Sequence, residues 1–149
     1  MVRDEKYPGP LKRELKILLM NSILTEEQTY AIVYYQRPNG ACPVQTYMES
    51  LPVKLEAKTA YMIDLLEKNG IMMREPDSKH LEDGIFELRT HFGSDSGRVL
   101  YFFFTGKRIV LTHGFLKKTN KTPRKEIKKA KSFRSDYMRR IAGGNNDKK

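Results

Sequence analysis

Arginines and lysines on three successive predicted strands could bind phosphate groups and act on them. Arg89 and Arg98 fall on neighbouring strands joined by a glycine-bearing turn, so their side chains can project beside each other. A guanidinium binds phosphate oxygens bidentately, which makes both residues candidate phosphate clamps. Lys117 and Lys118 stand at the end of the next strand and can reach the same face. Because neighbouring arginines lower the pKa of a lysine, either lysine could accept or donate a proton.

The strand that carries Arg89 offers further groups for proton transfer. Side chains alternate along a strand, so Glu87 and His91 share one face with Arg89, as a polar row on an open face of the sheet. Each of these residues also has a structural explanation. Glu87 can be a salt-bridge partner of Arg89, and Arg98 can pair with Glu87 or Asp95. His91, near the end of its strand, can be a surface histidine.

Other residues of the same stretch could contribute to a site. Tyr101 could donate a hydrogen bond, but alternation predicts that it lies opposite Arg98. His113 stands in a mainly apolar strand, where a histidine is typically buried and hydrogen-bonded. Lys117 and Lys118 could be plain contact residues without a proton role. Further basic residues indicate contacts to RNA rather than catalysis: Lys121, Arg124, Lys125 and Lys128.

The charge of the whole chain also indicates a polyanion partner. Its 149 residues carry a formal net charge of +10, and the basic residues are unevenly placed. Between residues 105 and 140, 13 lysines and arginines stand against two acids. A basic third beside a near-neutral remainder is typical of a surface that binds nucleic acid or the ribosome. A basic helix that merely keeps the protein soluble has the same composition.

Several classes of protein do not fit the sequence. Cys42 is the only cysteine, so neither an intrachain disulfide nor a cysteine-based metal site is expected. The three histidines lack the spacing of a helical metal pair, and no cofactor motif is present. The N-terminus begins with charges rather than a secretory signal, and no apolar run approaches the ~20 residues of a membrane span. We therefore expect a soluble, cytoplasmic protein without metal or cofactor.

The elements that must position these residues are predicted from periodicity and turn signals. Strands are expected over residues 29–36, 85–92, 98–104 and 108–115, with a five-residue hairpin turn at 93–97 and a connector at 71–79. Helical periods cover residues 11–24, 43–51, 53–70 and 123–141, the last behind an expected N-cap at Thr122. The apolar run 109–111 indicates a central strand. This order predicts an α+β fold: a small antiparallel sheet with helices packed on one face.

Three linked motifs in this stretch resemble the phage-derived branch of the RelE/HigB-like toxins. KHLEDGIFELR at residues 79–89 is similar to its K-x-L…G-x-x-E-L-R signature, and GRVLYF at 97–102 to its Y-R-V-L-Y-F strand. THGFLKKT at 112–119, followed by Thr122, Pro123 and Ala130, resembles its closing motif. The resemblance covers about residues 30–138. We therefore expect a toxin domain over residues 29–141. The residues themselves predict an N-terminal extension with a helix over 1–28 and a disordered tail over 142–149.

The resemblance implies the RelE-like microbial ribonuclease fold and the function of a type II toxin. Such toxins are endoribonucleases that cleave mRNA, usually on the ribosome, and a small helix-turn-helix antitoxin neutralises them. Metal-free RNA cleavage lets the 2′-OH attack the adjacent phosphate. It needs a proton acceptor, positive charge where the phosphorane forms and a donor for the leaving 5′-oxygen. The arginines, lysines, Glu87 and His91 named above are our candidates for these roles.

One departure from the toxin pattern leaves two alternatives open. Many such nucleases carry a tyrosine or histidine after the last strand, whereas this chain has lysine, threonine and asparagine there. Lysine and arginine must then transfer the protons, or activity is weak or lost. A non-catalytic RNA-binding module is one alternative, because Lys128, Lys129 and Lys131 near the start of a helix resemble a double-stranded RNA-binding domain. A phage protein that uses the fold as a protein-binding scaffold is the other.

Overall fold

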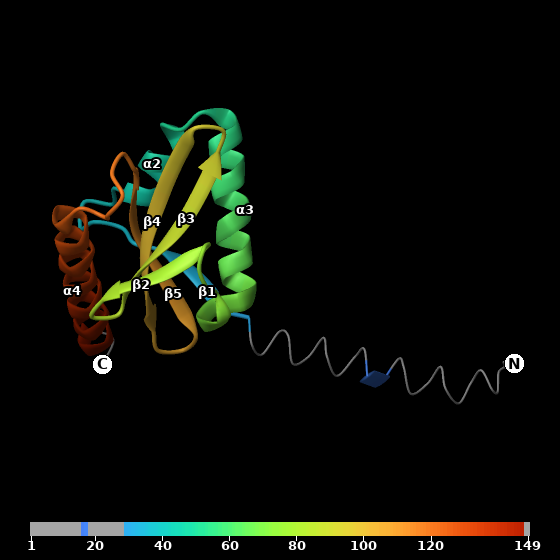
Figure 1. The fold of residues 1–149 in the computed structure, drawn as a ribbon. Helices are drawn as coiled ribbons and strands as arrows, with labels where there is room; N and C mark the ends of the chain where they lie inside the picture. Colours follow the sequence, from blue (N-terminus) through green and yellow to red (C-terminus); the bar gives the residue numbers. More distant parts are fainter. Residues whose placement is uncertain (1–15, 18–28, 148–149) are drawn as a thin grey trace, which may run out of the picture.

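A five-stranded sheet flanked by three helices forms the part of the chain that the computed structural model describes, which is residues 16, 17 and 29–147 (Figure 1). The elements in chain order are β1 (Ala31–Tyr34), α2 (Pro43–Glu49), α3 (Val53–Asn69), the short 3-10 helix η1 (Gly70–Met72), β2 (Ser78–Glu82), β3 (Ile85–Phe92), β4 (Asp95–Phe104), β5 (Arg108–Leu116) and α4 (Arg124–Asp147). The helix predicted over residues 11–24 lies outside the described residues except for positions 16 and 17, which are helical.

The strands lie in the order β1-β5-β4-β3-β2, and the sheet is mixed rather than antiparallel. β1 runs parallel to β5, with Ala31 opposite Arg108, and the other three pairs are antiparallel. β5 therefore has a neighbour on each side, as its apolar run predicts. β2 falls largely in the predicted connector. Its sequence, SKHLE, lacks the β-branched and aromatic residues that mark strands, and only pairing with β3 makes it one.

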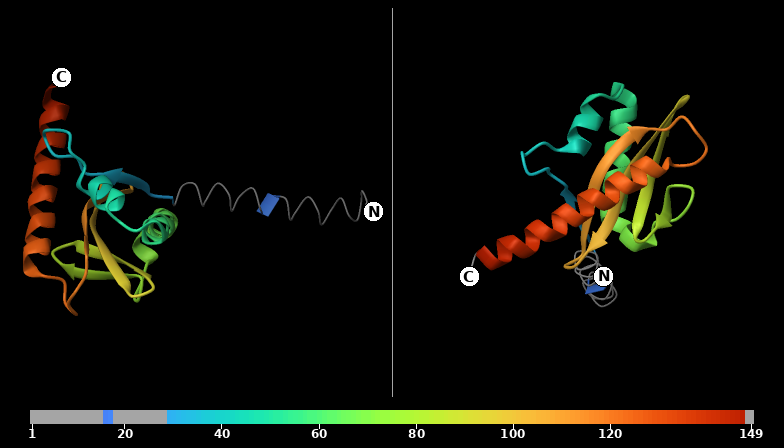
Figure 2. Two further views of the ribbon diagram at one scale, coloured as in Figure 1. Left: turned by 90° about the horizontal axis from the view of Figure 1, so that it is seen from above. Right: turned by 90° about the vertical axis from the view of Figure 1, so that its left-hand side faces the viewer.

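Helices cover both faces of the sheet, which corrects the prediction that they pack on one face while leaving the α+β class confirmed. α2 and α3 bury one core with Leu88, Val99 and Tyr101, whereas α4 buries a second core with Leu100 and Phe102. The left-hand view of Figure 2 shows the strands between α4 and the other two helices. The reason lies in β4, where consecutive apolar residues leave an apolar row on each face that must be covered.

A β-bulge in β5 decides which residues share a face with Arg98. The register shifts between Leu100, which pairs with His113, and Tyr101, which pairs with Leu111. Thr112 is thus an extra residue, and its hydroxyl donates to the carbonyl of Leu100 at 3.1 Å. Because a bulge reverses the alternation beyond it, the residues that follow Thr112 turn over. His113 therefore points towards α4, the face that also carries Arg98.

Two boundaries differ from those predicted. β4 begins at Asp95, which pairs with Phe92, so two residues form the turn instead of five. Gly93 adopts a φ of 62° in this turn, a conformation that favours glycine. α4 continues to Asp147, so the segment predicted as a tail from residue 142 begins within the helix. Among the described residues, no helix has the length and apolar character needed to cross a membrane.

Candidate active site

Two adjoining hollows lie where β3 and β4 meet the loop between β5 and α4, and both include Arg89, Lys117 and Asn120. The smaller, of about 280 Å³, is lined by Lys79, His80, Leu81, Glu87, Arg89, Lys117, Asn120, Lys121, Thr122, Arg124 and Ile127. The larger, of about 440 Å³, is lined by Arg89, Ser96, Arg98, Lys117, Lys118, Thr119 and Asn120. We call the two together the basic hollow. Five of the six residues predicted as catalytic line it, and only His91 does not.

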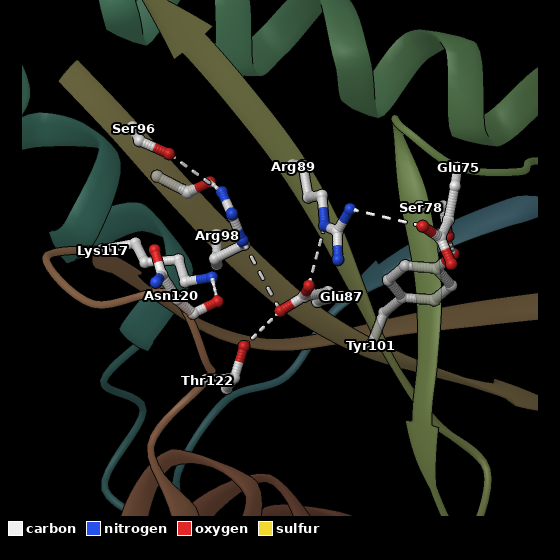
Figure 3. A network of polar contacts seen from close by, with 11 residues as sticks. Glu75, Ser78, Glu87, Arg89, Ser96, Arg98, Tyr101, Lys117, Asn120 and Thr122 are labelled. Atoms are coloured by element: carbon white, nitrogen blue, oxygen red, sulfur yellow. Dashed lines mark hydrogen bonds and ion pairs between the residues drawn. The ribbon is translucent and has the colours of Figure 1, made fainter. Parts of the chain in front are cut away.

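Arg89 and Arg98 lie directly opposite each other on β3 and β4, as the sequence predicts, and Glu87 holds them together. Nε of Arg89 donates to Glu87 Oε2 at 2.8 Å, and Nε of Arg98 lies 3.5 Å from Glu87 Oε1 (Figure 3). Glu87 is only 1% exposed, so the polar row predicted on an open face is covered at Glu87, whereas Arg89 is partly exposed and His91 is exposed. α4 and the loop before it provide that cover. Glu87 is the salt-bridge partner of both arginines.

The two arginines differ in what they can offer a ligand. Arg98 is 5% exposed, and its Nη1 donates to the Ser96 hydroxyl at 3.0 Å and to the Gly97 carbonyl at 2.8 Å. Burial lowers the pKa of Arg98 and Glu87 counteracts this, but an arginine stays charged in either case. The Arg89 side chain keeps 19% of its surface exposed. Arg89 is therefore placed to touch a phosphate, while Arg98 adds positive charge from behind it.

Lys117 borders both parts of the basic hollow. Its backbone N–H donates to the Ser96 carbonyl at 2.8 Å, which brings the start of the loop beside Arg98. Its Nζ donates to the carbonyl of Asn120. Partial burial, and next the charge of Arg98, lower the pKa of Lys117 below the ordinary value for lysine. A lysine in this state can give up its proton more readily than a free one.

The polar residues around these groups contribute in ways that the sequence did not reveal. Thr122, expected as an N-cap, donates its hydroxyl to Glu87 instead, and α4 begins at Arg124. Asn120, from the loop before α4, and Ser96, near the start of β4, both line the larger part of the basic hollow. Lys79 and His80 also line it, because β2 brings them there.

The residues predicted to contact RNA divide into two groups. Lys121 and Arg124 line the smaller part of the basic hollow, and Arg124 also donates to Glu82 Oε2 at 3.0 Å. Lys125 and Lys128 are exposed on α4 and line neither part. His91, predicted as catalytic, is exposed near the turn between β3 and β4. It pairs with Ser96, which lines the larger part, but does not itself line either part of the hollow.

Tyr101 and His113 lie outside the basic hollow. Tyr101 lies on the opposite face from Arg98, as alternation predicts, with its hydroxyl 2.5 Å from that of Ser78. Burial raises the pKa of Tyr101 to about 12. His113 is buried and hydrogen-bonded, also as predicted, with Nε2 2.9 Å from Glu126 Oε1. Burial lowers the pKa of His113, and its hydrogen bond to Glu126 opposes that shift.

Comparison with known proteins adds one finding to this geometry. The model of a family described as Phage derived protein Gp49-like (DUF891) matches residues 46–134. The matched stretch runs from α2 into α4 and contains every residue that lines the basic hollow. No curated protein gives a significant match to the chain.

Proposed function

The chain belongs to the Gp49-like family of phage-derived proteins, a RelE/HigB-type toxin family of toxin–antitoxin systems, and on that premise we propose that it is a metal-independent endoribonuclease. Its substrate in this proposal is mRNA, cleaved on the ribosome in the cytoplasm. Its proposed inhibitor is a small helix-turn-helix antitoxin. The observation that carries the proposal is the basic hollow, where two opposed arginines stand beside a lysine of lowered pKa.

The proposed reaction assigns a role to each group that faces the hollow. Lys117, in its neutral form, takes the proton of the 2′-OH, whose oxygen then attacks the adjacent phosphorus. Arg89 binds the phosphoryl oxygens as the phosphorane charge grows, and Arg98 adds to the field. Lys118, exposed at the mouth of the hollow, donates a proton to the leaving 5′-oxygen. The products are a 2′,3′-cyclic phosphate and a free 5′-hydroxyl.

Glu87 and His91 take no proton in this scheme. Both oxygens of Glu87 are engaged, one with Arg89 and the other with Thr122, so the carboxylate positions the arginine instead of acting as a base. His91 pairs with Ser96 but does not itself line the hollow, so the scheme gives it no role. Lys121, Arg124, Lys125 and Lys128 bind the RNA backbone on either side of the cleaved bond in this proposal. Their long cationic side chains suit sequence-independent contacts to phosphate.

The test is induced expression in a bacterial host, followed by growth measurement and mapping of mRNA ends. Wild type is compared with Arg89→Ala, Arg98→Ala, Lys117→Met and Lys118→Ala, with Lys68→Ala as a control that removes a charge from the far end of α3. We expect growth arrest and cuts in translated frames for wild type and the control, with relief in the other four. Thermal melting of each purified variant distinguishes a loss of catalytic activity from a failure to fold.

A binding-only protein gives a different pattern in the same experiment. Growth stays normal and transcripts stay intact with wild type, while purified protein still binds RNA with an affinity that falls with salt. That pattern would replace the nuclease proposal with the non-catalytic alternative. Normal growth without any RNA binding would favour the protein-binding scaffold.

A further inference from the structure

A second hollow lies beside β5, between α4 and the start of α2. It has a volume of about 280 Å³, and its lining includes Arg37, Lys129, His113 and Phe133. Arg37 comes from the segment between β1 and α2, Lys129 and Phe133 from α4, and His113 from β5. Segments far apart in the sequence thus bring two cations and an aromatic ring to one place, and the proposed reaction uses none of these residues.

The charge of this second hollow is positive. Arg37 and Lys129 are exposed, and the guanidinium of Arg37 lies 5.1 Å from the centre of the Phe133 ring. Lys129 is close enough to contribute to lowering the pKa of buried His113. Glu126 is hydrogen-bonded to His113, so two basic side chains stand against one acidic side chain here. A planar guanidinium and a mobile ammonium at the mouth of a hollow suit a phosphate group.

An aromatic residue connects the second hollow to the basic hollow. Phe115 pairs with Arg98 across β4 and β5. Its half-buried ring lies 6.0 Å from the ring of His113, which lines the second hollow. The bulge at Thr112 creates this arrangement, because it turns His113 and Phe115 onto the face that carries Arg98. An RNA strand that leaves Arg98 along β5 therefore meets an aromatic ring and then a second pair of cations.

We propose that Phe115 and the second hollow form a subsite for a nucleotide next to the cleaved bond, an inference that rests on the proposed ribonuclease function. Arg37 and Lys129 pair with a phosphate of that nucleotide, and the Phe115 ring stacks on its base. Single-stranded RNA is commonly held in this way, by a basic groove that follows the backbone and aromatic rings that stack on bases. The subsite would position the strand, while the chemistry stays at Arg89 and Lys117.

The experiment measures binding of a fluorescent 2′-O-methyl oligoribonucleotide, a probe that lacks the attacking hydroxyl, to the full chain at several salt concentrations. The variants are Arg37→Ala with Lys129→Ala, and Phe115→Leu, which keeps an apolar side chain but removes the ring. The matched control is Lys54→Ala with Lys68→Ala, which removes the same charge from α3. We expect the first double variant to bind about tenfold more weakly and to reduce the salt slope by about 1.4. We expect Phe115→Leu to weaken binding by about tenfold without changing the slope.

The outcomes separate this subsite from the proposed function. If wild type binds the probe and Arg89→Ala weakens binding, but the Arg37/Lys129 double variant behaves like the α3 control, the subsite is wrong and the nuclease site stands. If Phe115→Leu binds like wild type, the stacking role is wrong. If wild type neither binds the probe nor cleaves unmodified RNA, the proposed function fails and the subsite fails with it. Cleavage assays add a further check, because a subsite that positions RNA should raise KM more than it lowers kcat.

Discussion

At the scale of single residues, the geometry of the candidate site depends on Glu87. This carboxylate is 1% exposed, and a buried carboxylate is costly unless it is paired and hydrogen-bonded. Arg89, Arg98 and Thr122 supply those partners. The same pairing also stabilises the two arginines, because the carboxylate offsets the repulsion between two like-charged guanidiniums on adjacent strands. A group that sequence analysis offered as a possible base is better explained as their buried counter-ion.

Glu87→Gln is expected to lower the free energy of unfolding by about 3 kcal/mol, because it leaves the buried charge of Arg98 without its counter-ion. Urea denaturation measures the change. Glu75→Gln is the control, since Glu75 lies 3.9 Å from Arg89 but its side chain is 64% exposed. Its loss should change stability by less than about 0.5 kcal/mol. Equal stability of the two variants would show that Glu87 is not the counter-ion described here.

Lys117→Met is expected to lower the rate of RNA cleavage by about a hundredfold or more, the usual effect of removing a general base.

The effect of Lys117→Met on folding stability is expected to depend on pH. The folded-state pKa of Lys117 is lowered, so the folded protein binds that proton more weakly than the unfolded chain. The resulting loss of folding stability is complete at pH values below the folded-state pKa of Lys117. It disappears as the pH rises towards the ordinary pKa of lysine. Wild type should therefore gain stability relative to Lys117→Met across that window, measured by urea denaturation at neutral and alkaline pH.

At the scale of elements, two contacts hold the helices against the sheet on its two faces. On one face, Tyr47 of α2 lies flat over Gly114 of β5 and reaches Gly97 of β4 with its hydroxyl. Burial raises the pKa of Tyr47 to about 12. On the other face, the turn after β2 is joined to α4 by Glu82, which accepts hydrogen bonds from Arg124 and Lys131. Each contact yields a prediction.

Gly114→Ala is expected to lower the free energy of unfolding by about 1–3 kcal/mol, the usual cost of overpacking a core. A Cβ at this position would lie 2.2 Å from the ring of Tyr47, so α2 would have to move. Gly143→Ala is the matched control, because nothing lies within 4 Å of a Cβ placed there. In the interior of α4 that change should raise stability by about 0.5–1 kcal/mol. Thermal denaturation measures both, and a neutral Gly114→Ala would contradict the close packing of Tyr47.

The turn between β2 and β3 is expected to make stability sensitive to acid. Hydrogen bonds from Arg124 and Lys131 lower the pKa of Glu82 from 4.5 to about 2. A depressed carboxyl pKa contributes stability that is present above the unfolded value of 4.5 and is lost as pH falls through about 2. Glu82→Gln removes the titrating group, so its stability should fall less steeply than that of wild type between those pH values. Parallel slopes in urea denaturation at a series of pH values would refute this contribution.

At the scale of the whole molecule, both hollows adjoin α4. The basic hollow lies on the sheet face that α4 covers, and the second hollow lies beside β5, between α4 and the start of α2. A chain with a net charge of +10 attracts a polyanion over a distance, and in the proposed function these hollows receive the RNA.

Binding of single-stranded RNA should therefore weaken steeply with salt. If about five cations of the basic hollow contact phosphates, the slope of log K against log salt is expected to be about −3.5, or roughly 0.7 for each phosphate. Fluorescence anisotropy over a range of salt concentrations measures this slope. A slope near zero would show that RNA does not use this surface, and a slope unchanged by Arg89→Ala would place binding elsewhere on the molecule.

Local rules were sufficient for much of the fold and part of the site. The period of apolar residues predicted α3 and α4, and alternation placed Glu87 and Arg89 on one face of β3 and Tyr101 on the other side of the sheet from Arg98. A short turn between two strands also placed Arg89 beside Arg98. These predictions succeeded because helix period, strand alternation and hairpin pairing depend on residues close in the chain. The three linked motifs likewise led to a toxin family.

Only the tertiary structure decided which groups are accessible. α4 covers the face that looked open, so Glu87 is a buried counter-ion, and Thr122 bonds to it across 35 positions of sequence instead of capping a helix. The bulge at Thr112 turns Phe115 towards Arg98, and α4 brings Lys129 to Arg37. These contacts depend on how strands register and which face a helix covers. Both are set by burying the apolar surface of the whole chain, which no local pattern records.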